Sequence, residues 1–242
     1  MEITLVSFAD DRMSISQDKL IESGRKFGIE KFDSWRETDL PQYFIDDNKE
    51  VFANSFGAGF YIWKPFVIWQ SILKMKDGEI LLYCDSGVEL VDSVIPVINS
   101  MTDDIFLFGN GWPMRDWTKM DILMTINPEV DWHSEHTSKY HQVQASCMLF
   151  RVSERSRTFI KQWLLYCQFP GFCDNSPSSY PNVDTFRENR WDQAVIGALR
   201  YEWELPLHWY ACTTGYHLQK EYPNDRYRVF MNHHRMRNDE YK

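Results

Sequence analysis

The chain has 242 residues, a length that fits one large domain burying roughly 70–75% of the surface that the unfolded chain would expose. Its 35 acidic side chains outnumber the 26 basic ones and give a formal net charge of -9, which argues against a protein that follows nucleic acid phosphates with clustered lysine and arginine. The chain is rich in aromatic residues, with 10 Trp, 12 Tyr and 16 Phe. We therefore expect some of these rings to line a binding site.

The cysteines show neither a C-x-x-C pair nor a regular framework, which argues against a zinc site and a disulfide scaffold. We expect reduced, mostly buried thiols at Cys84, Cys147, Cys167, Cys173 and Cys212. The N-terminus lacks a basic start and a long apolar stretch, and no window reaches about 18 consecutive apolar residues. The sequence predicts a soluble, cytoplasmic protein without a transmembrane segment.

Apolar runs and helical spacing predict alternating strands and helices in the first part of the chain. A buried strand is expected over residues 3–8 and helices over 14–27 and 60–75. The turn at Asp77-Gly78 leads into a second buried strand that ends at Asp85. This β-α-(α)-β alternation over residues 1–87 is typical of an α/β fold with helices on the faces of a sheet.

The remaining elements follow the same signals. We expect helices over residues 91–100, 154–168 and 191–199, and strands over 104–108, 144–152 and 203–209. Breaker residues predict loops over 109–113 and 170–184. The tail is rich in His, Arg and Asn. No repeat, linker or low-complexity tract divides the chain.

Asp85-Ser86-Gly87 is the first candidate site, because it follows a buried strand at the edge where open α/β sheets bind ligands. A carboxylate there can hold a hard divalent cation that neutralises a diphosphate. The alternative is an aspartate that caps a turn made possible by Gly87.

The segment from Gly57 to Pro65 is the second candidate. Its glycines permit close backbone approach, a helix begins there, and Lys64 adds a mobile positive charge. These features indicate phosphate binding. A glycine-rich helix start with a solvated lysine explains the pattern equally well.

Two further groups are candidates for catalysis and acceptor binding. Asp192 lies in the first turn of a predicted helix, where it can act as a base or bind a hydroxyl, or only complement the helix dipole. Trp117, Lys119 and Asp121 place a ring, a cation and an acid close together, as a polyhydroxylated ligand requires, although a surface turn explains them too.

The histidines favour solvated or loop-bracing roles over zinc ligation. His133 and His136 lack the acidic partner of a helical H-E-x-x-H site. His233 and His234 stand in the tail, where one of them is a possible late metal ligand.

Five segments in this order resemble the GT-A-fold glycosyltransferases, specifically the small nucleotide-sugar-dependent enzymes of bacterial and large-virus surface-polysaccharide pathways. The resemblance covers roughly residues 3–200. It is carried by Val6–Asp10, Gly59–Pro65, Asp77–Gly87, Trp117–Asp121 and Trp191–Gln193.

The resemblance implies a single GT-A-like catalytic domain over residues 1–242, with a mixed, mostly parallel central sheet flanked by helices. Residues 1–110 would form the nucleotide-binding half and 111–242 the acceptor side. The implied reaction moves a hexose from a nucleotide-diphosphate donor, a UDP-sugar first of all, to a glycan or glycolipid acceptor.

The resemblance also implies roles for individual residues. Ser7, Asp10 and Arg12 would meet the nucleotide, while Lys64, Asp85 and Ser86 would meet the diphosphate end of the donor. Asp85 would ligate Mn²⁺ or Mg²⁺. Asp192 would act as the base of an inverting reaction or bind a sugar hydroxyl in a retaining one. On the acceptor side stand Trp117, Lys119 and Asp121.

One position departs from the family pattern, because Gly87 replaces the second acid of the D-x-D signature. Glu89 is a poor substitute, since four residues of extended chain span about 13 Å. Two other functions remain open. An inactive module of the same fold would bind a nucleotide sugar without turnover. A nucleotidyltransferase or phosphosugar enzyme would carry a basic, glycine-rich loop after the first strand, where this chain has Ala9-Asp10-Asp11-Arg12.

Overall fold

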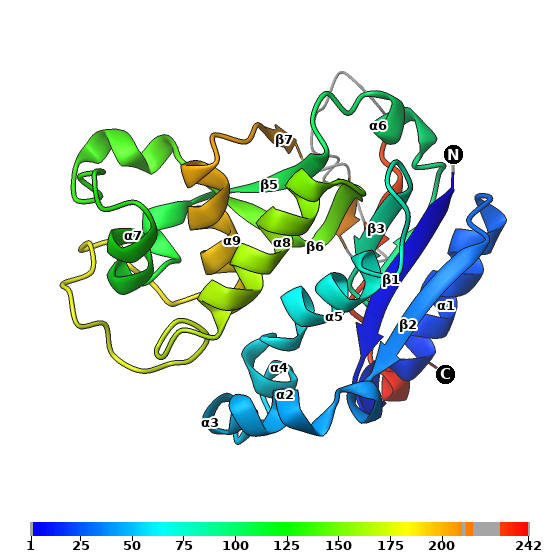
Figure 1. The fold of residues 1–242 in the computed structure, drawn as a ribbon, viewed down its shortest axis with the longest axis horizontal. Coiled ribbons are helices and arrows are strands. Elements are labelled where there is room, and N and C mark those ends of the chain that lie inside the picture. The colour runs from blue at the N-terminus through cyan, green and yellow to red at the C-terminus, as the bar shows by residue number, and fades with distance from the viewer. Residues whose placement is uncertain (1, 210–211, 215–227, 242) are drawn as a thin grey trace.

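The computed structural model describes residues 2–209, 212–214 and 228–241. Within these residues a central sheet contains the strands β1 (Ile3–Ala9), β2 (Lys31–Arg36), β3 (Ile80–Cys84), β5 (Ile105–Pro113), β6 (His141–Arg151) and β7 (Leu207–Trp209). Their order is β2-β1-β3-β6-β5-β7 (Figure 1). β1 is parallel to β2 and β3, and β5 is parallel to β7, whereas β6 is antiparallel to β3 and β5. The sheet is therefore mixed and mostly parallel, as predicted.

The helices pack on both faces of this sheet (Figure 1). The α-helices are α1 (Ser14–Lys26), α2 (Gln42–Asp47), α3 (Lys49–Phe52), α4 (Gly57–Phe60), α5 (Trp63–Ile72), α6 (Ile95–Asn99), α7 (Met120–Ile126), α8 (Glu154–Cys167) and α9 (Trp191–Glu202). Short 3-10 helices are η1 (Asp11–Met13), η2 (Glu37–Asp39), η3 (Met114–Asp116), η4 (Glu135–Lys139) and η5 (Asn238–Glu240).

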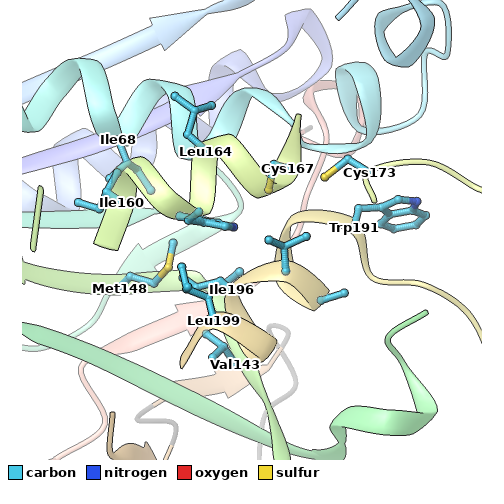
Figure 2. Close-up of a cluster of buried hydrophobic side chains, with 14 of the residues drawn as sticks. Ile68, Val143, Met148, Ile160, Leu164, Cys167, Cys173, Trp191, Ile196 and Leu199 are labelled. Atoms are coloured by element: carbon cyan, nitrogen blue, oxygen red, sulfur yellow. The ribbon is translucent and has the colours of Figure 1, made fainter. Parts of the chain in front are cut away.

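Alternate side chains of the inner strands enter two separate cores. Val6 and Tyr83 belong to the larger core beneath α5, α8 and α9, whereas Leu5 and Leu82 belong to the core on the α1 and α6 side. Figure 2 shows part of the larger core, with Ile160 of α8 among its side chains. β1 and β3 are buried on both faces, which is why their sequences are mostly apolar, with only Thr4 and Ser7 as hydroxyl residues in β1.

A second, small sheet carries the C-terminal part of the chain back to the end of β3. It consists of β4 (Val88–Leu90), β8 (Cys212–Thr214) and β9 (Met231–His233). β9 is antiparallel to β4, and Val88 lies opposite His233. This pairing brings the basic tail beside the loop that carries Asp85.

The predicted elements are largely confirmed, with several differences. The strand expected over residues 203–209 is confined to Leu207–Trp209, and β2 was not predicted. Residues 109–113 were expected to form a loop, but they continue β5, which pairs irregularly with β6 and places Gly109 opposite Val143. A Cβ at Gly109 would lie 2.6 Å from Leu207 of β7. This glycine therefore marks a close strand contact rather than a chain break.

Two further findings concern the cysteines and the character of the helices. All five cysteines are reduced and buried, as the sequence indicated. Across the described parts of the chain, every helix lacks the length and apolar character needed to pass through a lipid bilayer.

Candidate active site

A pocket of about 410 Å³ opens where β1 and β3 end, the edge at which open α/β sheets bind ligands. Segments far apart in the sequence form its walls. They are the end of β1 with η1, the 56–64 segment, the 85–87 turn after β3, residues 144–146 of β6, residues 190–193 at the start of α9, and the tail between 233 and 237.

Lys64 joins two carboxylates at the base of this pocket. Its buried Nζ lies 3.2 Å from Asp85 Oδ1 and 3.2 Å from Asp192 Oδ2, and it donates a hydrogen bond to the Ala145 carbonyl. Burial alone would lower the pKa of Lys64, but Asp192 and Asp85 outweigh it and hold the pKa above its ordinary value. We call these three residues the Lys64 cluster. The lysine is buried and fixed, which corrects the prediction of a mobile or solvated charge.

Asp85 is held in place by a second buried side chain. The Tyr83 hydroxyl donates to Asp85 Oδ1 at 2.7 Å, so this oxygen serves both the tyrosine and Lys64. Burial raises the pKa of Tyr83 well above its ordinary value, with a further contribution from Asp85, and keeps the hydroxyl protonated. The Asp85 side chain is 30% exposed and faces the pocket.

Asp192 is the buried acid of the cluster. Its side chain is only 4% exposed. Burial raises the pKa of Asp192 to about 6, although the charge of Lys64 opposes the shift. Apart from the ion pair with Lys64, Asp192 Oδ2 has no hydrogen bond with any described residue. A carboxylate of this pKa gains and loses its proton near neutral pH, as a general base must.

Two parts of the pocket wall, residues 57–61 and Trp191, have a strained backbone. Residues 57–61, which include the short element α4, all have positive φ values between 49° and 87°, so this segment is a left-handed turn and not a regular right-handed helix. Trp191 also has a positive φ of 47°, and its ring stacks on Phe60 with 5.6 Å between the centroids. Such conformations cost non-glycine residues free energy and concentrate at functional sites.

The rim of the pocket is cationic. Among the described residues, five cations line the pocket as a whole, namely Arg12, Lys64, Arg190, Arg235 and Arg237. The same part of the chain gives the pocket three acids, Asp10, Asp85 and Asp192. Three of these cations form ion pairs, since Lys64 contacts Asp85 and Asp192, Arg12 contacts Asp10 at 2.6 Å and Arg190 contacts Glu188 at 2.8 Å. The pocket thus carries excess positive charge in a chain of net charge -9.

The predicted metal at Asp85 is not confirmed. The described residues include no group of three or more His, Cys, Asp or Glu side chains that could hold an ion together. A Cβ at Gly87 would lie 3.0 Å from the Arg235 Cα, so the backbone leaves little room for the missing second acid. One Asp85 oxygen with His233 falls short of the oxygen-rich shell that Mg²⁺ or Mn²⁺ prefers. This donor set does not fit the ion.

The structure gathers most of the residues predicted to bind the donor, together with Asp192. Asp10, Arg12, Lys64, Asp85, Ser86 and Asp192 all line the pocket. Ser7 is not among them, because it is buried within β1 and accepts a hydrogen bond from Gln17 Nε2 at 3.0 Å.

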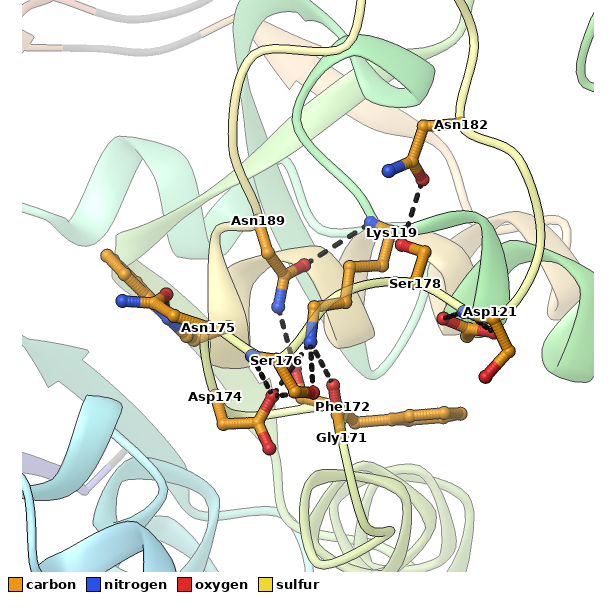
Figure 3. Close-up of polar contacts among 12 residues, drawn as sticks. Lys119, Asp121, Gly171, Phe172, Asp174, Asn175, Ser176, Ser178, Asn182 and Asn189 are labelled. Atoms are coloured by element: carbon orange, nitrogen blue, oxygen red, sulfur yellow. Dashed lines mark hydrogen bonds and ion pairs between the residues drawn. The ribbon is translucent and has the colours of Figure 1, made fainter.

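Two of the residues predicted to bind the acceptor hold a loop instead. Lys119 is buried and donates to the Gly171 carbonyl, to Asp174 and to Ser176 at 2.6, 2.7 and 3.0 Å (Figure 3). Asp121 accepts from the backbone of the same loop, at 2.9 Å from the Ser179 nitrogen. Neither residue lines the pocket.

Trp117 lies beside the pocket in an aromatic stack. Its ring is 4.6 Å from that of Trp112, which is 40% exposed. The Arg190 guanidinium lies 4.8 Å from the Trp117 ring and connects this stack to the pocket wall. A role in acceptor binding stays a prediction for Trp117.

Sequence reasoning missed several residues of the site. Tyr83 lies near the end of β3, two residues before Asp85, so the period-2 alternation of the strand predicts that both side chains point to one side. Arg235 and Arg237 had only a compositional signal, the basic tail. The left-handed turn was visible only as a glycine-rich segment.

No protein-family model matches this sequence, and no curated protein matches it either. The structure is similar to mouse xyloside xylosyltransferase 1, with a TM-score of 0.52, 9% identity, and coverage of 97% of this chain and 98% of that one. It is also similar to the galactosyltransferase LgtC (TM-score 0.50, 12% identity, coverage 96% and 86%).

A third similar structure is a glycosyltransferase involved in glycosylation of the major capsid of PBCV-1, with a TM-score of 0.50, 14% identity, and coverage of 96% of this chain and 92% of that one. By contrast, the chain spans only 40% of the bifunctional glycosyltransferase WbbM, at a TM-score of 0.48. This chain therefore has the fold of the GT-A glycosyltransferases, as its five sequence segments implied.

Proposed function

We propose that this chain is a glycosyltransferase of the hexosyltransferase type, which moves a sugar from a nucleoside-diphosphate donor, a UDP-sugar first of all, to a glycan or glycolipid acceptor. The Lys64 cluster carries the proposal. It places a buried acid with a pKa of about 6 beside a buried cation, inside a positively charged pocket at the carboxyl edge of a GT-A sheet.

The chemistry of sugar transfer matches this arrangement. The bond from the anomeric carbon to the diphosphate oxygen breaks as the bond to the acceptor oxygen forms, and negative charge develops on the departing diphosphate. Cations fixed in the pocket stabilise that charge because they need no reorganisation during the reaction. In an inverting reaction Asp192 takes the acceptor proton. In a retaining reaction it binds a sugar hydroxyl.

The first experiment is a binding and hydrolysis panel of UDP-, GDP-, CMP- and dTDP-sugars with the wild type and Asp192→Asn. We expect one donor class to bind and to be hydrolysed slowly without acceptor. Asp192→Asn should lower transfer by about 10²- to 10⁴-fold, because a general base contributes that much, and should leave the donor Kd nearly unchanged.

Asp184→Asn is the matched control, since Asp184 is exposed and lies outside the pocket. Donor binding without hydrolysis or transfer by the wild type would favour an inactive module of the same fold. Failure of every nucleotide sugar to bind would refute the proposed function.

A further inference from the structure

The tail of the chain lies where the missing second acid would stand. The Arg235 backbone nitrogen donates to the Gly87 carbonyl at 3.1 Å, and the Arg235 Cα is the nearest atom to a Cβ built on Gly87. Arg235 has a φ of 60°, in the left-handed region that a non-glycine residue adopts at a cost. The sequence departure at Gly87 and the placement of Arg235 are therefore one structural feature.

Both ends of this tail segment are anchored. On its N-terminal side β9 pairs with β4. On its C-terminal side Asn238 accepts from the Ile15 backbone nitrogen at 2.9 Å and donates to the Asp11 carbonyl at 2.6 Å. Tyr241 adds a hydroxyl contact of 3.0 Å with Ser16. Residues 235–237 are thus positioned before any ligand arrives.

The guanidinium groups of Arg235 and Arg237 have no carboxylate partner among the residues that the structure describes. Arg235 and Arg237 are exposed and line the pocket. Neither forms an ion pair with a carboxylate of the described residues, whereas Arg12, Arg190 and Lys64 each do. A guanidinium binds phosphate oxygens through paired hydrogen bonds of fixed geometry. Two such groups match a diphosphate in charge and in hydrogen-bonding geometry.

The position between the two carboxylates of the pocket is already filled by a cation. The Lys64 ammonium contacts Asp85 and Asp192 at 3.2 Å each. The Asp85 oxygen that faces Lys64 also accepts from Tyr83. These contacts occupy one oxygen of each acid that a divalent ion would need, and Arg235 and Arg237 add exposed positive charge to the pocket lining.

We propose that Arg235 and Arg237 form a clamp that binds the diphosphate of the nucleotide donor directly, so that donor binding requires no divalent cation. The inference rests on the proposed function, because the diphosphate is that of its donor. Residues 235–237 would then neutralise the diphosphate charge, the role that a divalent cation at Asp85 was expected to play.

The test measures binding by calorimetry in EDTA, with pyrophosphate and with UDP, GDP and dTDP, each nucleotide beside its nucleoside. The variants are Arg235→Ala/Arg237→Ala and, as the control with the same loss of charge outside the pocket, Arg25→Ala/Lys26→Ala. We expect the first variant to weaken pyrophosphate and diphosphate binding by about 10- to 100-fold, because each lost bond involves charged groups. The nucleoside Kd and the control should change less than about threefold.

A second variant separates charge from geometry. Arg235→Lys/Arg237→Lys keeps the charge but loses the paired hydrogen bonds, and we expect an intermediate loss. Gly87→Ala should also weaken diphosphate binding, because the new Cβ displaces the Arg235 backbone. Circular dichroism of each variant checks that it is folded.

The outcomes distinguish this inference from the proposed function. Diphosphate binding that disappears in EDTA and returns with Mn²⁺, or that survives in the double alanine variant, overturns the clamp and leaves the transferase proposal standing. Failure of all nucleotides and nucleotide sugars to bind, with or without Mn²⁺, refutes the proposed function itself.

Discussion

Asp192 shows how one residue acquires a function from its surroundings. A first-turn aspartate is ordinary in a helix, but here burial raises its pKa to about 6 while Lys64 opposes the shift. The proton therefore leaves Asp192 only as the pH rises through about 6. Below that value the group is neutral and cannot act as a base.

The transfer rate should follow this titration. We expect kcat/KM to increase with pH across about 6 and to level off above 7. In Lys64→Met the cation that lowers the pKa of Asp192 is gone, so the acidic limb of the profile should move to higher pH. A pH profile of kcat/KM for both proteins measures this. An acidic limb that stays at the same pH in Lys64→Met would contradict the coupling.

Lys119 illustrates the opposite case, a charged residue whose contacts explain it structurally. It is buried and donates to three groups of one loop, including the carboxylate of Asp174. Burial raises the pKa of Asp174, but the hydrogen bond and charge of Lys119 help to hold that pKa below its ordinary value.

Replacing this lysine should destabilise the fold. We expect Lys119→Met to lower the free energy of unfolding by about 1–3 kcal/mol, because charged hydrogen bonds are lost and Asp174 loses its ion-pair partner. Urea denaturation measures the change, and Lys161→Met, at an exposed position of α8, is the control. An unchanged stability with a raised acceptor KM would instead support the acceptor-binding role predicted from the sequence.

At the scale of elements, the left-handed turn at 57–61 connects the pocket to the core. Glycine holds two of its five positions. Gly59, with a φ of 87°, packs so closely that a Cβ would lie 2.8 Å from Phe52 Cδ1. The turn presents Ala58 and Tyr61 to the pocket, so its packing and the shape of the pocket depend on each other.

Two alanine substitutions separate backbone strain from packing. Gly28 has a nearly identical φ of 85°, but a Cβ there would meet nothing within 4 Å. We expect Gly28→Ala to cost about 1–2 kcal/mol of unfolding free energy from the left-handed backbone alone. Gly59→Ala should cost about 1–3 kcal/mol more from overpacking, and only this variant should weaken donor binding. Equal losses in both urea denaturation curves would disprove the packing contribution.

At the scale of the whole molecule, the sign of the charge differs between the pocket and the chain. The chain carries a net charge of -9, yet the pocket presents more cations than carboxylates. This distribution favours a small anionic ligand, because the field of the rim acts over short distances while the rest of the surface repels polyanions.

Salt should therefore weaken donor binding. Raising NaCl from about 50 to 500 mM shortens the Debye length from roughly 14 to 4 Å, and we expect the diphosphate Kd to rise several-fold. Arg235→Ala/Arg237→Ala should show a smaller salt dependence, because the screened charges are absent. Calorimetric titration at the two salt concentrations measures both slopes, and parallel slopes would count against the rim arginines as the source of the effect.

Local patterns in the sequence predict the layered α/β architecture and one edge of the site. Burial on both faces makes β1 and β3 mostly apolar. The helical spacing of apolar residues predicted α1, α8 and α9. Asp85 was found because a carboxylate after a buried strand marks the carboxyl edge of a sheet. These signals are local, since each depends on residues within one element.

The remaining residues of the site are brought together by contacts between segments that are distant in the sequence. Lys64 meets Asp192 and Ala145 across long stretches of chain, and its burial overturned the prediction of a mobile charge. Gly109 continues a strand because another strand packs against it, and Lys119 serves a loop rather than the pocket. The tail fills the space beside Gly87 because β9 returns to β4. Such contacts depend on which distant segments pack together, and no local pattern of residues records that choice.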